Sequence, residues 1–147
     1  MIDPPVQVAL AILHQQGQFL LQLRDNIPGI VYPGCWGFFG GHLEGDESPE
    51  AGLRRELLEE INYVPPLLTG FRCYYDSRVV RHVYQGSLTV PVQDLVLREG
   101  WDLGLWTPAE IERGARYSPQ ANQVRSLAPP TYQILLDFLE TDLGRAT

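Results

Sequence analysis

The sequence predicts an α/β fold in which a mixed β-sheet is packed between helices. Two observations favour this class: apolar runs of β-type residues lie both before and after one central helical segment, and an amphipathic helix closes the chain. Strands and helices arranged in this order bury their apolar faces when the strands form a sheet and the helices cover it. A chain of 147 residues is long enough for one domain with a core, so we expect a single domain over residues 1–147.

The first predicted elements are two strands. Residues 6–13 and 18–24 are apolar runs joined by His14-Gln15-Gln16-Gly17, which is the pattern of strand, turn and strand. Residues 25–34 hold two prolines and two glycines, and we expect a loop there.

A short aromatic strand and the central helix come next. Residues 35–39 are predicted to form the strand, which leads into a glycine turn at Gly40-Gly41. Ser48 suits the N-cap of the helix, and Pro49 suits its first position, where the missing N–H is not needed. The apolar stripe of this helix recurs every four residues and comprises Leu53, Leu57 and Ile61, with Leu58 beside it.

The second half of the chain predicts further strands and two helices. The β-rich runs are residues 67–76, 79–91 and 103–106. Thr107-Pro108-Ala109-Glu110 has the pattern of a capped helix start. Residues 114–129 are polar and are predicted to be a mobile stretch. The closing helix begins at Pro130, and its positions spaced to pack on the sheet are Ile134, Leu135, Phe138 and Leu139.

Residues 41–63, GHLEGDESPEAGLRRELLEEINY, carry the chemistry of this sequence. The helix within them presents three carboxylates at positions i, i+3 and i+4, namely Glu56, Glu59 and Glu60. These offsets share one helix face, so the negative charges are crowded and call for a cation. Oxygen ligands of this kind suit Mg²⁺, and the flexible backbone at Gly40-Gly41 could add a carbonyl ligand. The alternative is an ordinary solvated helix whose glutamates pair with Arg54 and Arg55.

The same segment resembles the Nudix box, whose pattern is G, five residues, E, seven residues, then R-E-apolar-x-E-E-x-G-apolar. The positions that fall on this spacing are Gly41, Glu47, Arg55, Glu56, Leu57, Glu59 and Glu60. Asn62 replaces the last glycine, and asparagine is the non-glycine residue that best tolerates a left-handed helix stop. Tyr63 takes the final apolar place. The resemblance implies the α/β/α sandwich of the Nudix family, in agreement with the fold class above.

The resemblance also implies a function. A Nudix hydrolase of this kind would be a Mg²⁺-dependent (or Mn²⁺-dependent) pyrophosphohydrolase that cleaves a diphosphate bond in a nucleoside triphosphate or a nucleoside diphosphate derivative and releases a nucleoside monophosphate. The metal ligands it implies are the Gly40 carbonyl and the carboxylates of Glu56, Glu59 and Glu60. Glu47 and Arg55 would support the geometry of the loop and helix around them.

The catalytic residues implied are Glu56, Glu59 and Glu99, and the general base stays open. Many relatives place one more glutamate on a loop shortly before a late tryptophan, and Glu99 precedes Trp106 in this way. Asp102 competes for that role, and Glu56 is the other candidate base.

The substrate contacts are predicted from the same resemblance. Arg24 ends the second strand, where many relatives place an arginine near the substrate, although a surface salt bridge is the alternative. Phe38 could stack on a base, with core packing as the alternative. The proline expected near Val79 in ADP-ribose hydrolases is absent, as is the tyrosine expected nearby in dinucleoside polyphosphate hydrolases. The run WGFFGG resembles the group that cleanses nucleoside triphosphates.

Two other functions fit the same scaffold. A non-catalytic Nudix domain that binds a nucleotide or regulates would be expected to lack a metal carboxylate, and none is missing here. The other is a metal-dependent isomerase or a purely structural interaction domain. An isomerase would need a catalytic cysteine, either Cys35 or Cys73, and neither has a supporting context in the sequence. His42 is expected to be exposed, and His82 to be a structural histidine with satisfied hydrogen bonds.

Composition sets the remaining expectations. A net charge of −7 argues against nonspecific binding of nucleic acid or anionic membranes, so the expected partner is a small-molecule nucleotide. No basic n-region precedes the first apolar run and no apolar stretch approaches ~18 residues, so we expect no signal peptide, no membrane span and a cytoplasmic location. Cys35 and Cys73 lack metal-type spacing and are expected to be free buried thiols. Family relatives are often dimers, which makes a homodimer a further expectation by analogy.

Overall fold

The computed structural model of the chain describes residues 3–146. Backbone contacts divide the chain into two compact units: unit 1 joins the chain up to Leu13 with Phe39–Val96, and unit 2 joins His14–Phe38 with the chain from Leu97 onward. The predicted single domain begins at Met1 and ends at Thr147, which both lie outside the described residues. That domain assignment therefore stays a prediction, and the two units are described separately.

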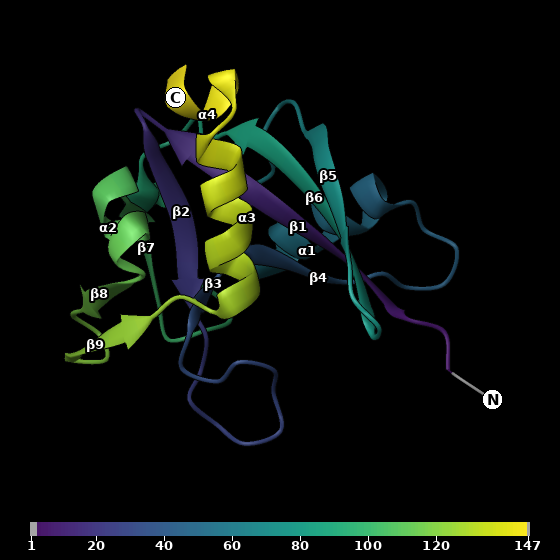
Figure 1. Cartoon of the computed structure of the whole chain (residues 1–147), viewed down its shortest axis with the longest axis horizontal. Coiled ribbons are helices and arrows are strands. Elements are labelled where there is room, and N and C mark those ends of the chain that lie inside the picture. Colours follow the sequence, from purple (N-terminus) through teal and green to yellow (C-terminus); the bar gives the residue numbers. More distant parts are fainter. Residues whose placement is uncertain (1–2, 147) are drawn as a thin grey trace. The chain divides into compact units, whose positions relative to one another are not determined.

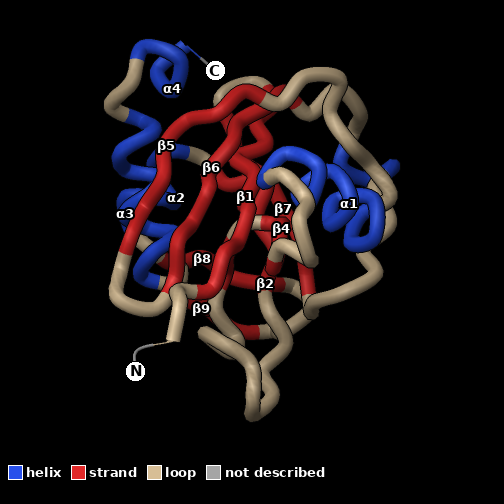
Figure 2. Tube along the Cα trace, turned by 90° about the vertical axis from the view of Figure 1, so that its right-hand side faces the viewer, coloured by secondary structure: helices blue, strands red, loops and turns tan. Residues whose placement is uncertain are grey.

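Unit 1 is a set of strands with one helix. Its elements are β1 (Val6–Gln15, all but the last two residues), β4 (Phe39–His42), α1 (Pro49–Ile61), β5 (Thr69–Tyr75), β6 (Val79–Ser87) and the 3-10 turn η1 (Val92–Asp94). β4 pairs antiparallel with β1, so that Ala9 lies opposite Gly41. β6 lies next to β1, and β5 pairs antiparallel with β6 at the edge. Both ribbon views show β1, β6 and β5 side by side (Figures 1 and 2).

The helix α1 begins and ends as its sequence predicts. The Ser48 side chain accepts a hydrogen bond from the Ala51 N–H at 3.2 Å, and Pro49 occupies the first turn. Asn62 ends the helix in the left-handed conformation, with φ of 53°. The predicted stripe of Leu53, Leu57 and Ile61 is fully buried. The prediction for Leu58 is wrong: its side chain is 53% exposed, because a step of one residue turns it about 100° away from Leu57.

The predicted aromatic strand is in fact two strands. β3 (Trp36–Gly37) belongs to unit 2 and β4 to unit 1, and Gly40-Gly41 lie inside β4 rather than in a turn. Gly40 has a φ of +136°, and a Cβ placed there would lie 2.1 Å from the Ala9 carbonyl oxygen. The glycine is therefore needed for the close approach of β4 to β1.

Unit 2 holds the remaining strands and helices. They are β2 (Gln18–Leu23), β3, β7 (Asp102–Trp106), α2 (Pro108–Arg113), β8 (Ala115–Ser118), β9 (Gln123–Ser126), α3 (Pro129–Leu139) and α4 (Asp142–Ala146). β2 pairs antiparallel with both β3 and β7. Thr107 and Glu110 form the capping box predicted at the start of α2. Trp36 and Trp106 pack edge to face in the core, with ring centroids 5.4 Å apart.

The polar stretch over residues 114–129 was predicted to be mobile, and this prediction is wrong. It contains the antiparallel hairpin of β8 and β9 (Figure 1). The Ser118 hydroxyl is fully buried at the end of β8, donates to Asp102 at 2.6 Å and accepts from the Ala121 N–H. These hydrogen bonds order a segment whose composition alone resembles a loop. On α3, Ile134, Leu135 and Phe138 are buried as predicted, whereas Leu139 is half-buried.

Candidate active site

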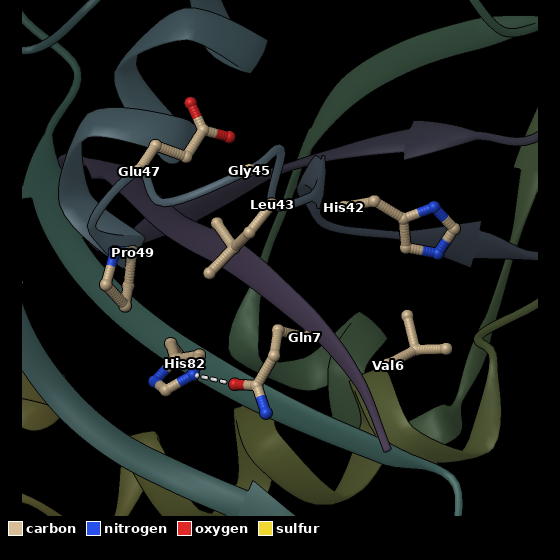
Figure 3. Close-up of a pocket in the computed structure, with 8 residues that line it drawn as sticks. All are labelled: Val6, Gln7, His42, Leu43, Gly45, Glu47, Pro49 and His82. Carbon is tan, nitrogen blue, oxygen red and sulfur yellow. Dashed lines mark hydrogen bonds between the residues drawn. The ribbon is translucent and has the colours of Figure 1, made fainter. Parts of the chain in front are cut away.

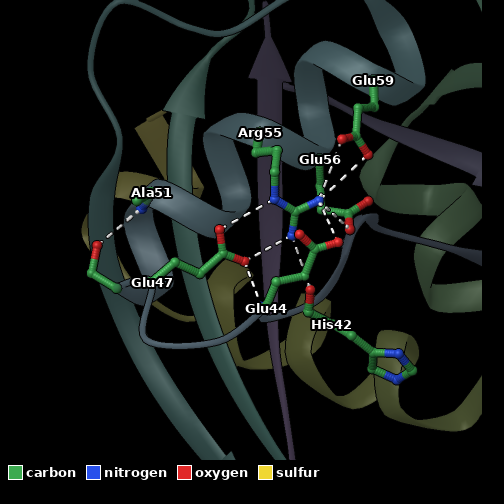
Figure 4. Close-up of polar contacts among 8 residues, drawn as sticks. His42, Glu44, Glu47, Ala51, Arg55, Glu56 and Glu59 are labelled. Atoms are coloured by element: carbon green, nitrogen blue, oxygen red, sulfur yellow. Dashed lines mark hydrogen bonds and ion pairs between the residues drawn. The ribbon is translucent and has the colours of Figure 1, made fainter.

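The acidic face of α1 is organised by one guanidinium group. Four carboxylates surround Arg55, and we call these five side chains the Arg55 cluster; its members are Glu44, Glu47, Glu56, Glu59 and Arg55 (Figure 4). Nη1 lies 3.1 Å from Glu56 Oε1, 3.4 Å from Glu59 Oε2 and 3.6 Å from Glu44 Oε1. The crowding of negative charge predicted on this helix is thus relieved in part by a cation of the helix itself.

Glu47 and Arg55 tie the preceding loop to the helix. Arg55 Nη2 lies 2.7 Å from Glu47 Oε1 and Nε lies 3.2 Å from Oε2, a two-pronged contact. Glu47 also accepts from the Glu44 N–H, and Arg55 donates to the His42 carbonyl at 3.2 Å. The hydrogen bond from Arg55 holds the pKa of Glu47 below its usual value, and the same bond raises the pKa of Arg55. The pair therefore stays charged and anchors the loop at neutral pH.

Glu60, on the same helix, contacts the backbone of β4. It is only 4% exposed, and its Oε1 accepts from the Gly40 N–H at 2.9 Å. Glu56 approaches the same strand, since a Cβ on Gly41 would lie 2.7 to 2.9 Å from its carboxyl atoms. The missing side chain of Gly41 therefore leaves the space that the Glu56 carboxylate fills, while Glu60 bonds the backbone N–H of Gly40. Sequence reasoning placed Glu60 on the same face as Glu56 and did not anticipate its burial.

The donors of this region have the chemistry that a divalent cation requires. Carboxylate oxygens are hard ligands of the type that Mg²⁺ prefers, and those of Glu56 and Glu60 lie beside the half-buried backbone of Gly40 and Gly41 in β4. Among the described residues, however, the geometry forms no group of three or more His, Cys, Asp or Glu side chains that could hold a metal ion. The reason is visible in the contacts: Glu56 and Glu59 turn to Arg55 while Glu60 turns to Gly40. The pairing of helix glutamates with Arg54 and Arg55, the alternative to a metal site, is also present, with Arg54 on Glu50 at 3.1 Å.

The other predicted site residues belong to unit 2. Glu99 is exposed on the loop before β7. Asp102, its competitor, accepts from both Ser118 and the Leu103 N–H. Arg24 has a buried Nε that finds no hydrogen-bond partner within residues 3–146, and Phe38 is 6% exposed. The roles assigned to these residues stay predictions.

A cavity of about 640 Å³ lies in unit 1 against the loop that precedes α1. His42 lines it from the end of β4, Leu43 and Glu47 line it from the loop, and Gln7 and His82 line it from β1 and β6 (Figure 3). His42 is exposed as predicted. No sequence signal pointed to this cavity, because its walls come from segments as far apart as residues 7 and 82.

His82 has the satisfied hydrogen bonds that were predicted for it. Its Nε2 lies 2.7 Å from Gln7 Oε1, and its Nδ1 lies 3.4 Å from the sulfur of Cys73. Both cysteines are free thiols as predicted, but they are not buried: Cys73 is exposed and Cys35 is half-buried. The prediction missed the exposure of Cys73 because β5 is an edge strand, exposed over much of its length.

Comparison with known proteins settles the family. The model of the NUDIX domain matches residues 3–135 of this chain. The chain belongs to the NUDIX domain family. No curated protein matches it at the level of the whole sequence.

Solved structures share the Nudix fold. The MutT NUDIX hydrolase from Burkholderia pseudomallei superposes with a TM-score of 0.69 at 21% identity, over 92% of this chain and 98% of that one. The NUDIX domain of Shewanella oneidensis NrtR, complexed with ADP ribose, gives a TM-score of 0.70 at 23% identity, over 99% of this chain and 90% of that one. The MutT protein from Methanosarcina mazei Go1 gives 0.67 at 19% identity, over 96% and 99%. These likenesses confirm the predicted fold class, a mixed β-sheet with helices.

No helix within residues 3–146 combines the length and the apolar character that crossing a membrane requires.

Proposed function

We propose that this Nudix domain is a Mg²⁺-dependent pyrophosphohydrolase. It cleaves a diphosphate bond in a nucleoside triphosphate or a nucleoside diphosphate derivative and releases a nucleoside monophosphate. Mn²⁺ would serve in place of Mg²⁺, since both accept oxygen ligands. The family model extends over both units, which supports one functional domain over residues 1–147.

The observation that supports this proposal most directly is the contact between carboxylates of α1 and the backbone of Gly40 and Gly41 in β4. Glu56 fills the space left by Gly41, and Glu60 holds the Gly40 N–H. Oxygen donors from a helix and from an adjacent strand are thereby placed next to one another. We assign the metal to the carboxylates of Glu56, Glu59 and Glu60 and to the carbonyl of Gly40. A divalent ion bound there would neutralise phosphate charge and lower the pKa of a bound water.

The residues of the chain supply the positioning. Glu47 holds Arg55, and Arg55 in turn holds Glu56 and Glu59 at one end of its guanidinium group. Arg55 thus holds these two carboxylates close to one another, and both would turn from Arg55 toward the metal when it binds. The hydrogen bond that Glu60 accepts from the Gly40 N–H fixes the position of β4 relative to α1. In phosphoryl transfer the protein forms few covalent bonds with the substrate, so the rate depends on positioning of this kind.

A base and a cation for the substrate complete the proposal. Glu56 and Glu99 are the candidate bases, and Asp102 is the weaker candidate because two donors already engage it. The Arg24 side chain, with a buried Nε that lacks a partner within the described residues, is suited to pair with a phosphate oxygen. Phe38 is the weaker candidate for a substrate contact, because its ring is only 6% exposed and core packing, the alternative to stacking on a base, accounts for it.

The deciding experiment measures turnover against a panel of nucleoside triphosphates and nucleoside diphosphate derivatives, ADP-ribose among them, with Mg²⁺ and with excess EDTA. Release of a nucleoside monophosphate only with Mg²⁺ is the expected result. Glu59→Gln should lower kcat by about 10²-fold, since it removes one charged oxygen donor at the site. Arg54→Gln is the matched control, because Arg54 pairs with Glu50 outside the cluster. Undiminished turnover of Glu59→Gln would remove Glu59 from the site.

The second candidate is a Nudix domain that binds a nucleotide without cleaving it. The neighbour complexed with ADP ribose is the observation that favours it. In that case calorimetry would record binding of ADP-ribose while the panel yields no product at any metal concentration.

A further inference from the structure

A cluster of reactive side chains in unit 1 takes no part in the proposed hydrolysis. Cys73 on β5 and His82 on β6 lie opposite one another in the β-ladder, and the thiol sulfur lies 3.4 Å from Nδ1. The other ring nitrogen, Nε2, lies 2.7 Å from the amide oxygen of Gln7 on β1. Figure 3 shows the bond between Gln7 and His82. Three neighbouring strands thus bring a thiol, an imidazole and an amide into one line.

The two hydrogen bonds determine which ring nitrogen of His82 carries the proton. An amide oxygen only accepts, so Nε2 carries the proton that it shares with Gln7. In neutral His82 the Nδ1 atom then has a free lone pair, which accepts from the thiol of Cys73. A nucleophile within reach of a base, with a third group that orients the base, is the arrangement by which enzymes activate thiols.

The thiol is also accessible. Cys73 is exposed, and it lines a second, smaller cavity of about 210 Å³. His82 and Arg72 line the same cavity, and the Arg72 guanidinium lies over the ring of Phe71 at 4.8 Å. The cavity that Cys73 lines is large enough for a small group, and Arg72 supplies a positive charge among its lining residues. Buried cysteines are inert, whereas exposed thiols beside a base and a cation react.

We propose that Cys73 is a nucleophilic thiol that exchanges with low-molecular-weight disulfides bearing carboxylates. His82 acts as the base and Gln7 is a positioning residue. The Cys73 proton moves to Nδ1 of His82, and the thiolate attacks one sulfur of the disulfide R–S–S–R. Its S–S bond breaks as the bond between Cys73 and R–S forms, and the leaving thiolate takes the proton from the imidazolium. One disulfide is consumed, and one mixed disulfide and one thiol are formed.

The test uses the whole chain with Cys35→Ser, so that one thiol remains. The probe is 5,5′-dithiobis(2-nitrobenzoic acid), a disulfide with carboxylates, and released thiolate gives the second-order rate constant at pH 7. Folded protein should react at least about fivefold faster than the same chain unfolded in urea, because only the folded chain supplies the base. The uncharged bis(2-hydroxyethyl) disulfide should show a smaller ratio of folded to unfolded rates, since it cannot pair with Arg72.

Variants separate activation from simple exposure. His82→Gln should lower the rate by about fivefold or more, whereas His42→Gln, at the other histidine of the large cavity, should leave it unchanged. Gln7→Leu should lower the rate, and Gln7→Glu should restore it because a carboxylate keeps the accepting oxygen. Circular dichroism checks the fold of each variant. A folded chain that reacts no faster than the unfolded one, or an unchanged rate in folded His82→Gln, overturns the proposal. If His82→Gln does not fold, the comparison of folded with unfolded Cys35→Ser still decides it.

Discussion

Glu59 and Glu60 are neighbours in the proposed metal site, yet the structure predicts that their removal has different consequences. The Glu59 side chain is 58% exposed and meets only the Nη1 edge of Arg55, at 3.4 Å. Glu60 is 4% exposed and accepts from the Gly40 N–H at 2.9 Å. Replacing Glu60 by alanine removes a hydrogen bond to a charged acceptor and leaves the half-buried N–H of Gly40 to find another partner.

The magnitude follows from that bond. A hydrogen bond to a charged group contributes about 1.5–3 kcal/mol to the free energy of unfolding. For a chain of this size each kcal/mol shifts Tm by about 2–4 °C, so Glu60→Ala should lower Tm by roughly 3–12 °C. Glu59→Ala loses one exposed ion pair, worth about 0.5 kcal/mol or less, and should shift Tm by no more than about 2 °C.

Thermal unfolding followed by circular dichroism, in excess EDTA, measures the difference without a contribution from bound metal. Turnover with Mg²⁺ is measured on the same preparations, and both variants should lose it. Equal Tm values for the two variants would refute the reasoning, since they would mean that the contact between Glu60 and Gly40 does not stabilise the fold.

Three other predictions concern the backbone and the pH dependence. Gly40→Ala should lower the free energy of unfolding by roughly 3 kcal/mol or more, because its Cβ would lie 2.1 Å from the Ala9 carbonyl oxygen. Gly29 also has a positive φ, but a Cβ there would have nothing within 4 Å, so Gly29→Ala should lower it by only about 1–2 kcal/mol. Urea unfolding measures both values. Asn62→Gly should keep the free energy of unfolding within about 1 kcal/mol, while Asn62→Val should lower it by more, since Asn62 has a φ of 53°. Hydrogen bonds from Arg81 and from two backbone N–H groups lower the pKa of Asp76 to about 2. The pKa of Asp76 is lower in the folded chain than in the unfolded chain, so the stabilisation by its charged form is complete above about pH 4 and is lost between about pH 4 and pH 2. Asp76→Asn should therefore weaken the fall in the free energy of unfolding over this pH range.

The elements that could be predicted from the sequence are those set by local chemistry. Ser48, Pro49 and Asn62 fix the ends of α1, and Thr107 and Glu110 fix the start of α2, through contacts within a few residues. The family spacing of residues 41–63 was likewise sufficient to predict the fold class, which the comparisons confirm.

The errors concern contacts between distant segments. The hairpin in residues 114–129 depends on Ser118 meeting Asp102, and the location of Gly40 inside a strand depends on Ala9. The burial of Glu60 depends on the same strand. Cys73 had no visible context in the sequence because His82 reaches it from another strand, and Gln7, which contacts His82, lies 75 positions away from that histidine in the sequence. Composition and periodicity describe one segment of the sequence at a time, so they do not predict which distant segments come into contact.

The position of Arg55 among four carboxylates restricts how this protein can change over generations. Loss of the guanidinium in one step would leave Glu44, Glu47, Glu56 and Glu59 repelling one another, whereas the same loss after the carboxylates had gone would cost far less. The effects of these substitutions are therefore non-additive, and their order matters. The order of substitution that costs the least stability therefore replaces the carboxylates of the Arg55 cluster first and Arg55 last.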